Sequence, residues 1–460
     1  MEKQEMAKTD SPKKIVIIGM GTGGLYASRG ATSFDRNVEM TIIEKRDYDM
    51  FSPCGLPYAI EGKVPSFDDL KHSVPTTRRL KKLTSHEALS IDTKGKRVEV
   101  KNLESGEVFW LPYDSLIVST GSEPIVLPIP GAHELLGKGV HVVTNPEEAE
   151  ALRDAALKSE RAVVVGGGAI GLEIAFALKE LGLDVYVTKR SPPPFPRNLD
   201  PDMGEKIREY LESKGFHILF GKGIDAVNGE DRVESVEIAG ETIPTDLVVM
   251  AVGVRPKSGI AEEAGIAAER GAIITDERME TNVKDVYAIG DCCLSFSGVD
   301  SKPITVALAT TAFRQAVIAG INAAGGDERY DGSLGTFVSF VGDLEIACTG
   351  YNTEIAERNG FKTVSGRVNM QTKPGWMPDA KDVSVKIIVD ADSGGLLGGQ
   401  CIGDEGAAWR VNVISVAIKT KMTIEDFTRI ELAYCPAVSD LYDPLLVAAD
   451  AALRRFKRGR

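Results

Sequence analysis

One cysteine, Cys54, lies between two glycine-rich runs with the spacing G-x-G-x-x-G, which is typical of dinucleotide-binding turns. Each run follows an apolar stretch rich in β-branched residues and precedes an apolar helical pattern, the order that a phosphate-binding strand, turn and helix require. The runs are residues 19–24 and residues 166–171. Two such turns in one chain, with a single thiol near the first, predict a flavin enzyme that transfers electrons to sulfur.

The first glycine-rich run is expected to hold the pyrophosphate of a dinucleotide at the positive end of the following helix. Gly19 makes the tight turn, Gly21 lets the backbone approach the phosphates, and Gly24 allows the helix to pack closely on the strand. Glu44, at the end of the next apolar strand, is placed to accept hydrogen bonds from a ribose. The same cofactor is expected to contact Met20, Thr22, Gly23 and Lys45.

The second run predicts a second nucleotide site, formed by Gly166, Gly168, Ala169, Ile170 and Gly171. The strand after it ends in Lys189 and Arg190, where a carboxylate would select an unphosphorylated ribose. Two cations there favour a ribose 2′-phosphate, so NADPH is preferred over NADH. The alternative is an ordinary pair of surface cations. Glu173, just beyond the run, either binds the nicotinamide amide or is a plain carboxylate on the helix surface.

Length, charge and cysteine spacing exclude several classes of protein. The chain has 460 residues, too many for one hydrophobic core, and a net charge of −13, which argues against a nucleic-acid partner. Six cysteines are scattered without C-x-x-C spacing, and the few histidines show no ligand pattern, so no metal site is expected. The basic run at residues 454–460 is interpreted as a solvated terminus.

The sequence also predicts where the protein works. No stretch approaches the roughly 20 consecutive apolar residues of a membrane span, so no membrane partner is expected. Residues 1–12 are polar and charged, unlike the apolar core of a signal peptide. With thiols expected to stay reduced, these features predict a cytoplasmic protein.

Alternating buried strands and helical runs predict an α/β fold with two Rossmann-like three-layer nucleotide-binding domains and a C-terminal α+β domain. The first domain is expected over residues 1–145 and, after an excursion, again over residues 259–333, because a buried strand recurs at residues 285–291. The second is expected over residues 146–258. From residue 334 to residue 460 the pattern changes to alternating strands followed by two helical runs, which predicts the third domain.

Three more motifs accompany the glycine-rich runs: Y-D-x-L-I-x-S-T-G at residues 113–121, V-G-V-R-P at residues 252–256 and Y-A-I-G-D at residues 287–291. With them, nearly the whole chain resembles the FAD-dependent pyridine nucleotide-disulfide oxidoreductases. The lone cysteine in S-P-C-G-L-P-Y, residues 52–58, is similar to that of the single-cysteine branch. That branch includes coenzyme A-disulfide reductases, NADH-dependent persulfide reductases, and NADH oxidases and peroxidases.

The resemblance implies FAD on the first unit, NADPH or NADH on the second, and a homodimer formed through the C-terminal domain. It implies that the flavin site includes Ala88, Thr120, Gly121 and Asp291, with Asp291 at the ribityl chain and the backbone of Ala88 near the adenine. Gly253 is assigned to the nucleotide sites. In this family a C-terminal segment reaches the partner's active cysteine, and the matching segment here contains Tyr434 and Cys435.

Cys54 is expected to act without a neighbouring cysteine, because Ala59 occupies the position at which two-cysteine relatives carry theirs. Pro57 suits the first turn of a helix, so Cys54 is expected just before a helix N-terminus. The helix dipole would bring the pKa of the thiol below its free value of about 8.5. The thiolate then attacks a disulfide or persulfide and keeps one half as a mixed disulfide, which electrons from the reduced flavin release. The alternative is an inert, buried cysteine.

The C-terminal segment raises two further hypotheses. By the resemblance, Tyr434 donates a hydrogen bond to the leaving thiolate or to the substrate sulfur. Cys435 departs from the family, whose members usually have a small inert residue beside this tyrosine. It is either a second redox thiol that resolves an adduct on Cys54 of the partner subunit, or a side chain that points away from the site.

Two other departures bear on the substrate. Coenzyme A-disulfide reductases have basic residues along the helix after the first run, whereas this chain has only Arg29 there. Coenzyme A is therefore less favoured than a smaller disulfide, persulfide or polysulfide, although it stays an open alternative. Many relatives have an aromatic residue at the position of Ala169, and a methyl group here leaves the flavin more open to oxygen.

The sequence therefore favours an NAD(P)H-dependent flavoprotein reductase of disulfides, persulfides or polysulfides that acts through Cys54. The nearest alternative is an NAD(P)H oxidase or peroxidase in which this cysteine cycles through a sulfenic acid. A further alternative, from another class, is a flavin electron carrier or redox sensor whose target is a protein partner.

Overall fold

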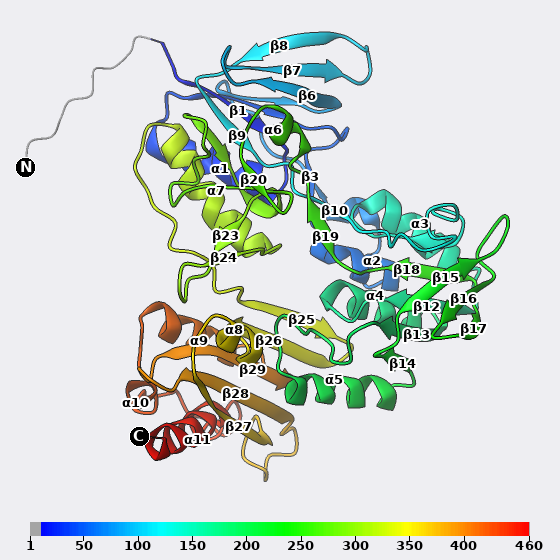
Figure 1. Cartoon of the computed structure of the whole chain (residues 1–460), viewed down its shortest axis with the longest axis vertical. Coiled ribbons are helices and arrows are strands. Elements are labelled where there is room, and N and C mark those ends of the chain that lie inside the picture. The colour runs from blue at the N-terminus through cyan, green and yellow to red at the C-terminus, as the bar shows by residue number, and fades with distance from the viewer. Residues whose placement is uncertain (1–10, 460) are drawn as a thin grey trace, which may run out of the picture.

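The computed structural model describes residues 11–459, so Met1 to Asp10 and Arg460, with the predictions made for them, lie outside the described residues. The chain forms three lobes (Figure 1). The upper lobe contains the first glycine-rich turn, the right-hand lobe contains the second, and the lower lobe is the C-terminal domain. This arrangement confirms the predicted α/β class, with two Rossmann-like domains and a C-terminal α+β domain.

The first domain is built on a five-stranded parallel sheet whose strand order is β22-β9-β1-β2-β5. The bounds are β1 Lys14–Ile18, β2 Glu39–Ile43, β5 Leu80–Leu83, β9 Ser115–Val118 and β22 Val286–Ala288. β22 pairs with β9 across more than 160 residues of chain, so this strand of the first sheet comes from a distant part of the sequence. A three-stranded antiparallel sheet, β6 His86–Asp92, β7 Arg97–Asn102 and β8 Val108–Pro112, forms its third layer.

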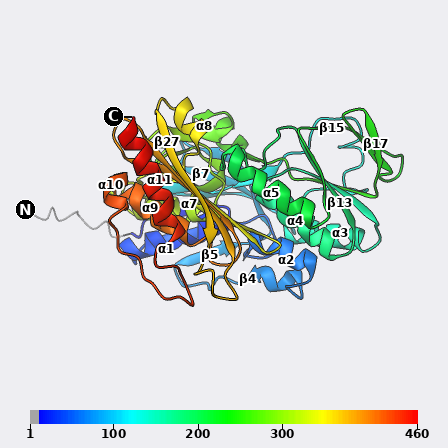
Figure 2. The same cartoon turned by 90° about the horizontal axis from the view of Figure 1, so that it is seen from below.

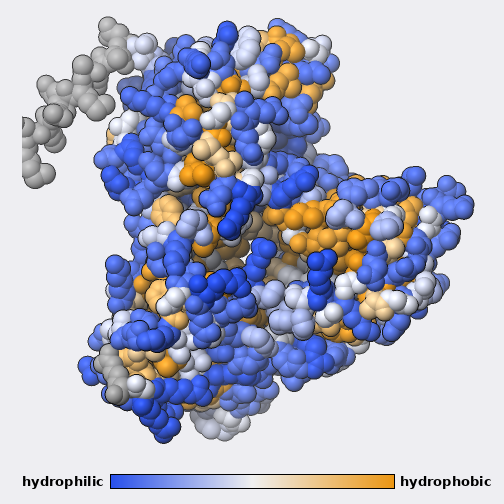
Figure 3. Space-filling model, in the orientation of Figure 1, coloured by the Kyte–Doolittle hydropathy of each residue, from blue (hydrophilic) through white to orange (hydrophobic). Residues whose placement is uncertain are grey.

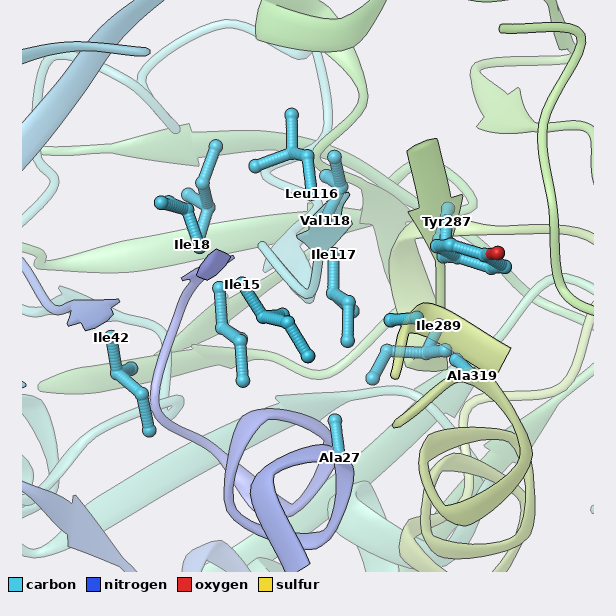
Figure 4. Packing of buried hydrophobic residues seen from close by; sticks show 14 of the residues in the cluster. Ile15, Ile18, Ala27, Ile42, Leu116, Ile117, Val118, Tyr287, Ile289 and Ala319 are labelled. Atoms are coloured by element: carbon cyan, nitrogen blue, oxygen red, sulfur yellow. The ribbon is translucent and has the colours of Figure 1, made fainter. Parts of the chain in front are cut away.

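The strands of the first sheet are apolar on both faces because helices and the third layer cover them. In Figure 4, Ile15, Ile42 and Ile117 point toward helices α1 (Thr22–Phe34) and α7 (Ala309–Ala323). Leu116 and Ile18 point to the opposite face. All five side chains are at most 6% exposed, and the full burial of one such side chain contributes roughly 1.5–3 kcal/mol. This core fixes the strand end from which the first glycine-rich turn emerges.

The second domain repeats the design with the strand order β11-β18-β12-β13-β14, all parallel. Its strands are β11 Val140–His141, β12 Arg161–Val165, β13 Asp184–Lys189, β14 His217–Phe220 and β18 Leu247–Met250. Its helices are α3 Pro146–Ala156, α4 Ala169–Glu180 and α5 Pro201–Ser213. A small antiparallel sheet flanks it, with β15 Ile224–Asn228, β16 Ser235–Ile238 and β17 Glu241–Pro244. Since β11 already pairs with β18, the sheet begins before the predicted boundary at residue 146.

The C-terminal domain is a five-stranded antiparallel sheet with the order β25-β26-β29-β28-β27. Its strands are β25 Phe337–Val341, β26 Leu344–Gly350, β27 Thr363–Gln371, β28 Asp382–Asp390 and β29 Leu396–Gly403. Helices cover it, as Figure 2 shows from below: α8 Thr353–Arg358, α9 Arg410–Lys419, α10 Ile424–Phe427 and α11 Pro444–Arg458. The sequence predicted alternating strands followed by two helical runs from residue 334, and helices α9 and α11 lie in that range after the strands.

Two short elements join the lobes. Strands β10 (Ser122–Pro124) and β19 (Val254–Pro256) pair antiparallel and carry the chain between the first and second domains. Helix α2 (Leu56–Glu61) follows Cys54, but its apolar residues pack in the core of the second domain with α3 and α4. The peptide that carries the thiol is therefore fixed between the two nucleotide-binding lobes.

Candidate active site between two nucleotide-binding turns

The first glycine-rich turn has the shape that a pyrophosphate needs. A Cβ at Gly24 would lie 2.1 Å from the carbonyl oxygen of Gly19, so only glycine lets α1 start this close to β1. A Cβ at Gly21 would meet nothing within 4 Å, so the backbone there faces open space. No side chain caps the first turn of α1, and that turn carries no acidic residue. Free N–H groups in open space fit the phosphates of FAD.

Glu44 is buried directly after β2, and both of its carboxylate oxygens accept hydrogen bonds from this chain. Its Oε2 accepts the backbone N–H of Met20 at 2.8 Å and Nη2 of Arg46 at 2.8 Å. Its Oε1 accepts the backbone N–H of Arg46 at 3.0 Å and Nε at 2.7 Å. Glu44 therefore stabilises the first turn directly, and its predicted bond to a ribose stays a prediction. In this structure the carboxylate of Glu44 binds the guanidinium group of Arg46, a residue that sequence reasoning missed.

The other predicted flavin residues lie on loops around the same sheet edge. Asp291, on a short 3₁₀ turn after β22, accepts a hydrogen bond from Ser122 Oγ at 2.9 Å, and burial raises the pKa of its carboxyl group. Thr120 Oγ1 donates to the carbonyl of Lys257 at 2.5 Å, and Gly121 has a left-handed φ of +71°. Sequence reasoning missed Ser122, although it directly follows the S-T-G motif.

Two further predicted residues lie close to Glu44, because Lys45 follows it directly and the first residue of β6, His86, donates its backbone N–H to the carbonyl of Glu44 at 2.9 Å. Ala88 is partly buried on β6, next to a bulge in the pairing of β6 with β7. Lys45 is exposed and forms a 2.7 Å ion pair with Glu87. Both flank the strand ends at which an adenine would lie, and their contacts with a cofactor stay predictions.

Cys54 is exposed in a 3₁₀ turn, Pro53–Gly55, that leads directly into α2. Pro57 occupies the first turn of α2, as predicted. Beside the turn, β3 (Met50–Phe51) pairs with β4 (Lys71–His72), and Nε2 of His72 lies 2.7 Å from Ser52 Oγ. The alternative of an inert, buried cysteine does not fit an exposed thiol on a turn held from both sides.

The prediction of a lowered pKa for Cys54 is wrong in this structure. Although the side chain is exposed, the surrounding protein removes enough water to raise the pKa of the thiol above its ordinary value. The carboxylate of Glu173 raises it further, and backbone hydrogen bonding lowers it only in part. The dipole of α2, which has six residues, does not overcome burial and a neighbouring negative charge.

Glu173 is not the plain surface carboxylate that the sequence allowed. It lies on α4, partly buried, and its Oε1 accepts a 2.7 Å hydrogen bond from Ser339 Oγ on β25. Burial raises the pKa of its carboxyl group, and bonds from Ser339 and the backbone of Phe340 lower it in part. Together with Pro57 and Tyr58 of α2, it lines a cavity of about 290 Å³ between the lobes. Figure 3 shows the surface hollowed where the three lobes meet.

The second glycine-rich turn has the same construction as the first. A Cβ at Gly171 would lie 2.5 Å from the carbonyl oxygen of Gly166, while one at Gly168 would meet nothing within 4 Å. Ala169 is partly buried at the start of α4, and Ile170 is 49% exposed. Gly253 lies on the exposed loop after β18. This turn fits a second dinucleotide.

The two cations after β13 differ in their surroundings. Arg190 is exposed. Lys189 is partly buried, which lowers the pKa of its amine, and its Nζ donates to both oxygens of Ser191. Its stem packs on the turn, because a Cβ at Gly167 would lie 2.8 Å from Lys189 Cδ. Lys189 is therefore adjacent to the second turn, whereas the side chain of Arg190 lies near Gly223, and the predicted contacts of both with a nucleotide's ribose stay predictions.

The structure of one chain does not bring Tyr434 or Cys435 to Cys54. Both residues lie on an exposed segment between α10 and α11, in which Tyr434 is 47% and Val438 is 72% exposed. Within residues 11–459, no hydrogen bond joins this segment to the turn of Cys54. The remaining four cysteines (Cys292, Cys293, Cys348 and Cys401) are buried.

Within residues 11–459, no group of three or more histidine, cysteine or acidic side chains is arranged to hold a metal ion. None of the helices in this range has the length and hydropathy to span a membrane.

Comparison with known proteins agrees with this geometry. Residues 13–316 match the pyridine nucleotide-disulphide oxidoreductase family, and residues 337–443 match its dimerisation domain. An NADH oxidase of Methanocaldococcus jannaschii is 34% identical over 96% of this chain and 99% of its own. An NAD(P)H coenzyme A polysulfide/persulfide reductase of Pyrococcus horikoshii is 30% identical over 95% of this chain and 98% of its own.

Two solved structures have the same architecture. The reduced CoADR-RHD of Bacillus anthracis superposes with a TM-score of 0.92 at 31% identity, covering 97% of this chain and 81% of that protein. A water-forming NADPH oxidase, engineered from the Lactobacillus brevis NADH oxidase and bound to NADPH, has a TM-score of 0.91 at 26% identity, covering 97% and 99%. The chain belongs to the pyridine nucleotide-disulphide oxidoreductase family, and is an FAD- and NAD(P)H-dependent oxidoreductase with the family's dimerisation domain.

Proposed function

We propose that this enzyme is an NADPH-preferring reductase of small disulfides, persulfides or polysulfides, with Cys54 as the residue that attacks the substrate. The observation that carries the proposal is the position of this thiol. It is exposed, on a turn fixed between the two nucleotide-binding lobes, whereas four of the other five cysteines are buried. The persulfide reductase of Pyrococcus horikoshii supports the same class of substrate.

The chain's own residues supply binding and proton control. The turns at Gly19–Gly24 and Gly166–Gly171 hold FAD and NADPH, whose bound pair supplies a hydride relay that delivers two electrons to sulfur. The thiolate of Cys54 attacks the outer sulfur, forms a mixed disulfide or cysteine persulfide, and expels the other half of the substrate. Burial and the negative charge of Glu173 raise the pKa of this thiol, so the thiolate forms at a higher pH than in a free cysteine.

NADPH is favoured by the cations after β13. The engineered NADPH oxidase carries five substitutions. At three consecutive positions among them, aspartate, alanine and methionine are replaced by alanine, arginine and serine. This chain has arginine followed by serine, Arg190-Ser191, and no acidic residue among residues 186–198. An arginine at this strand end can pair with a 2′-phosphate, while the missing carboxylate removes the partner of a free 2′-hydroxyl.

The enzyme is proposed to work in the cytoplasm as a homodimer. The match of residues 337–443 to the dimerisation domain supports the homodimer, and six free cysteines are in keeping with a reducing compartment. In the dimer, the segment with Tyr434 and Cys435 is proposed to reach Cys54 of the partner subunit, where the tyrosine donates a hydrogen bond to the substrate sulfur. If Cys435→Ser changes neither turnover nor thiol titre, a redox role for Cys435 is excluded.

A second candidate is an NAD(P)H oxidase, favoured by the 34% identity to an NADH oxidase and by the methyl side chain of Ala169 beside the nicotinamide site. One experiment separates the two functions. NADPH consumption is measured without oxygen in the presence of polysulfide, and oxygen uptake is measured in air without sulfur compounds. The reductase is supported if polysulfide accelerates NADPH consumption at least tenfold over the rate in air. It is wrong if oxygen uptake dominates and no sulfur compound increases the rate.

A further inference from the structure

The segment of residues 190–200, which begins with Arg190, the second residue of the cation pair, is here called the nucleotide loop. It connects β13 to α5 and contains four prolines, at positions 192, 193, 194 and 196, which limit its conformations. The backbone N–H of Phe195, in the middle of the loop, donates to the carbonyl of Gly167 at 3.0 Å. This bond fixes the loop directly to the second glycine-rich turn.

The nucleotide loop is also held from outside its own domain. The ring of Phe195 stacks on Phe337 of β25, with ring centroids 5.9 Å apart and an interplanar angle of 20°. Asn352, the residue before α8, is buried, and its Nδ2 donates to the carbonyl oxygens of Pro196 at 3.2 Å and Leu199 at 3.3 Å. Both outside partners belong to the dimerisation domain.

The last residue of the loop, Asp200, is bound to the dimerisation domain by an ion pair and hydrogen bonds. Asp200 is buried and accepts hydrogen bonds from the backbone N–H and Oγ1 of Thr353, both at 2.8 Å. Its carboxylate also lies 2.8 Å from Nζ of Lys386, and its own N–H donates to Oε1 of Gln400 at 3.0 Å. Asp200 precedes α5 but does not cap it, because the dimerisation domain uses its carboxylate.

A loop that only connected two elements of one domain would bond mainly within that domain. Here the dimerisation domain makes contacts along residues 195–200, close to the phosphate-binding turn. The first residues of the loop, Arg190 and Ser191, are those that a 2′-phosphate would contact. Their position relative to the turn at Gly167 therefore depends on contacts made by the other domain.

We propose that the dimerisation domain positions the nucleotide loop, and that Asn352 is a positioning residue for the 2′-phosphate end of NADPH. This inference rests on the proposed preference for NADPH. Asn352 touches no nucleotide itself: it holds two carbonyl groups of the loop and thereby fixes where Arg190 meets the ligand. The domain that joins two subunits thus also contributes to the choice between NADPH and NADH.

The experiment uses Asn352→Asp in the FAD-loaded enzyme. An aspartate keeps the oxygen that accepts the N–H of Ile355 and caps α8, but it loses the amide that donates to the loop. Asn145→Asp is the matched control, because Asn145 caps α3 through the N–H of Glu148 and has no bond to the loop. The probes are 2′,5′-ADP, which carries the 2′-phosphate, and 5′-AMP, which lacks it.

The expected result is a loss of about tenfold in affinity for 2′,5′-ADP, the size of one or two hydrogen bonds, with 5′-AMP changed less than about twofold. The KM for NADPH rises with the same ratio, while kcat, FAD content and the Asn145→Asp control stay unchanged. Equal losses for both probes, or no loss for either, would overturn the inference.

A replacement variant and a wild-type comparison separate failure of the positioning role from failure of the proposed NADPH preference. If Asn352→Asp does not load FAD, Thr353→Val replaces it, because this change removes only the hydroxyl bond to Asp200, and it is expected to weaken 2′,5′-ADP about threefold. If the wild-type enzyme binds 2′,5′-ADP no better than 5′-AMP, the proposed NADPH preference itself is wrong. A wild type that prefers 2′,5′-ADP, with variants that keep the full preference, contradicts only the positioning role.

Discussion

Ser339 Oγ donates a 2.7 Å hydrogen bond to Glu173 Oε1, which joins the dimerisation domain to the helix that follows the second glycine-rich turn. Ser339 is 1% exposed, so this bond is shielded from water. Its carboxylate partner raises the pKa of Cys54. The charge that controls the reactive thiol is therefore held in place by a strand of the C-terminal domain.

Glu173→Gln should increase the reactivity of Cys54 at neutral pH. The pKa of the thiol is raised by burial and by this carboxylate, so the thiol stays protonated up to a higher pH than a free cysteine. Removing the negative charge lowers the pKa, and the thiolate forms at lower pH. Alkylation rates with iodoacetamide, measured from pH 6 to 10, should show the midpoint move downward. Glu180→Gln, an exposed carboxylate on the same helix, should leave the midpoint in place. A midpoint that moves upward or not at all would contradict this role.

Arg190→Ala should raise the KM for NADPH by roughly 10- to 100-fold, the size of a charge-assisted bond to phosphate, and change the KM for NADH less than about twofold. Steady-state kinetics with both nucleotides measure the ratio. Arg197→Ala is the control, because Arg197 is an exposed arginine later in the same loop. Equal increases in KM for both nucleotides would show that Arg190 does not recognise the 2′-phosphate.

Two glycines in the first turn should respond differently to alanine. At Gly24 the new methyl would lie 2.1 Å from the carbonyl of Gly19, so Gly24→Ala should destabilise the fold by about 1–3 kcal/mol and lose FAD. At Gly21 the methyl meets no protein atom within 4 Å, so Gly21→Ala should keep the stability of the apoprotein but lose FAD. Urea unfolding of apoprotein and flavin absorbance separate the cases. Full FAD content in Gly21→Ala would place the pyrophosphate elsewhere.

Lys386→Met should destabilise the enzyme by roughly 3–5 kcal/mol, because it leaves the buried carboxylate of Asp200 without its cationic partner, while Asp202 keeps its ion pair with Arg367. Nζ of Lys386, which is 8% exposed, lies 2.8 Å from carboxylate oxygens of both Asp200 and Asp202. Lys362→Met is the control: its ion pair with Asp392 has both side chains at least 70% exposed, so removing it should cost about 0–1 kcal/mol. Equal losses in chemical denaturation would show that the two ion pairs have similar strength.

The sequence predicted well the features that depend on local patterns. Both glycine-rich turns, the strands before them and the turn of Cys54 follow from glycine spacing, β-branched runs and one proline, which act within about ten residues. The three-stranded sheets at β6–β8 and β15–β17 were missed, because their strands are short and several of them, such as β6 and β17, are largely exposed or only partly buried.

Long-range contacts could not be predicted from one sequence. Ser339 and Glu173 are separated by 166 residues, and Asn352 and Pro196 by 156, so no local pattern indicates either bond. The predicted direction of the pKa shift at Cys54 was wrong for the same reason. Pro57, three residues away, is enough to predict the helix and its dipole. The burial of Cys54 and the charge of Glu173 depend on other parts of the fold.

The most direct test of the account counts the electrons that Cys54 stores. The enzyme is exposed to polysulfide, freed of excess reagent, and titrated with NADPH without oxygen. Reduction of a cysteine persulfide to thiol and one hydrogen sulfide takes two electrons, and full reduction of FAD takes two more. Wild type and Cys435→Ser should consume two NADPH per subunit and release one sulfide, while Cys54→Ser should consume one and release none. Equal consumption by wild type and Cys54→Ser would contradict the central role of this cysteine.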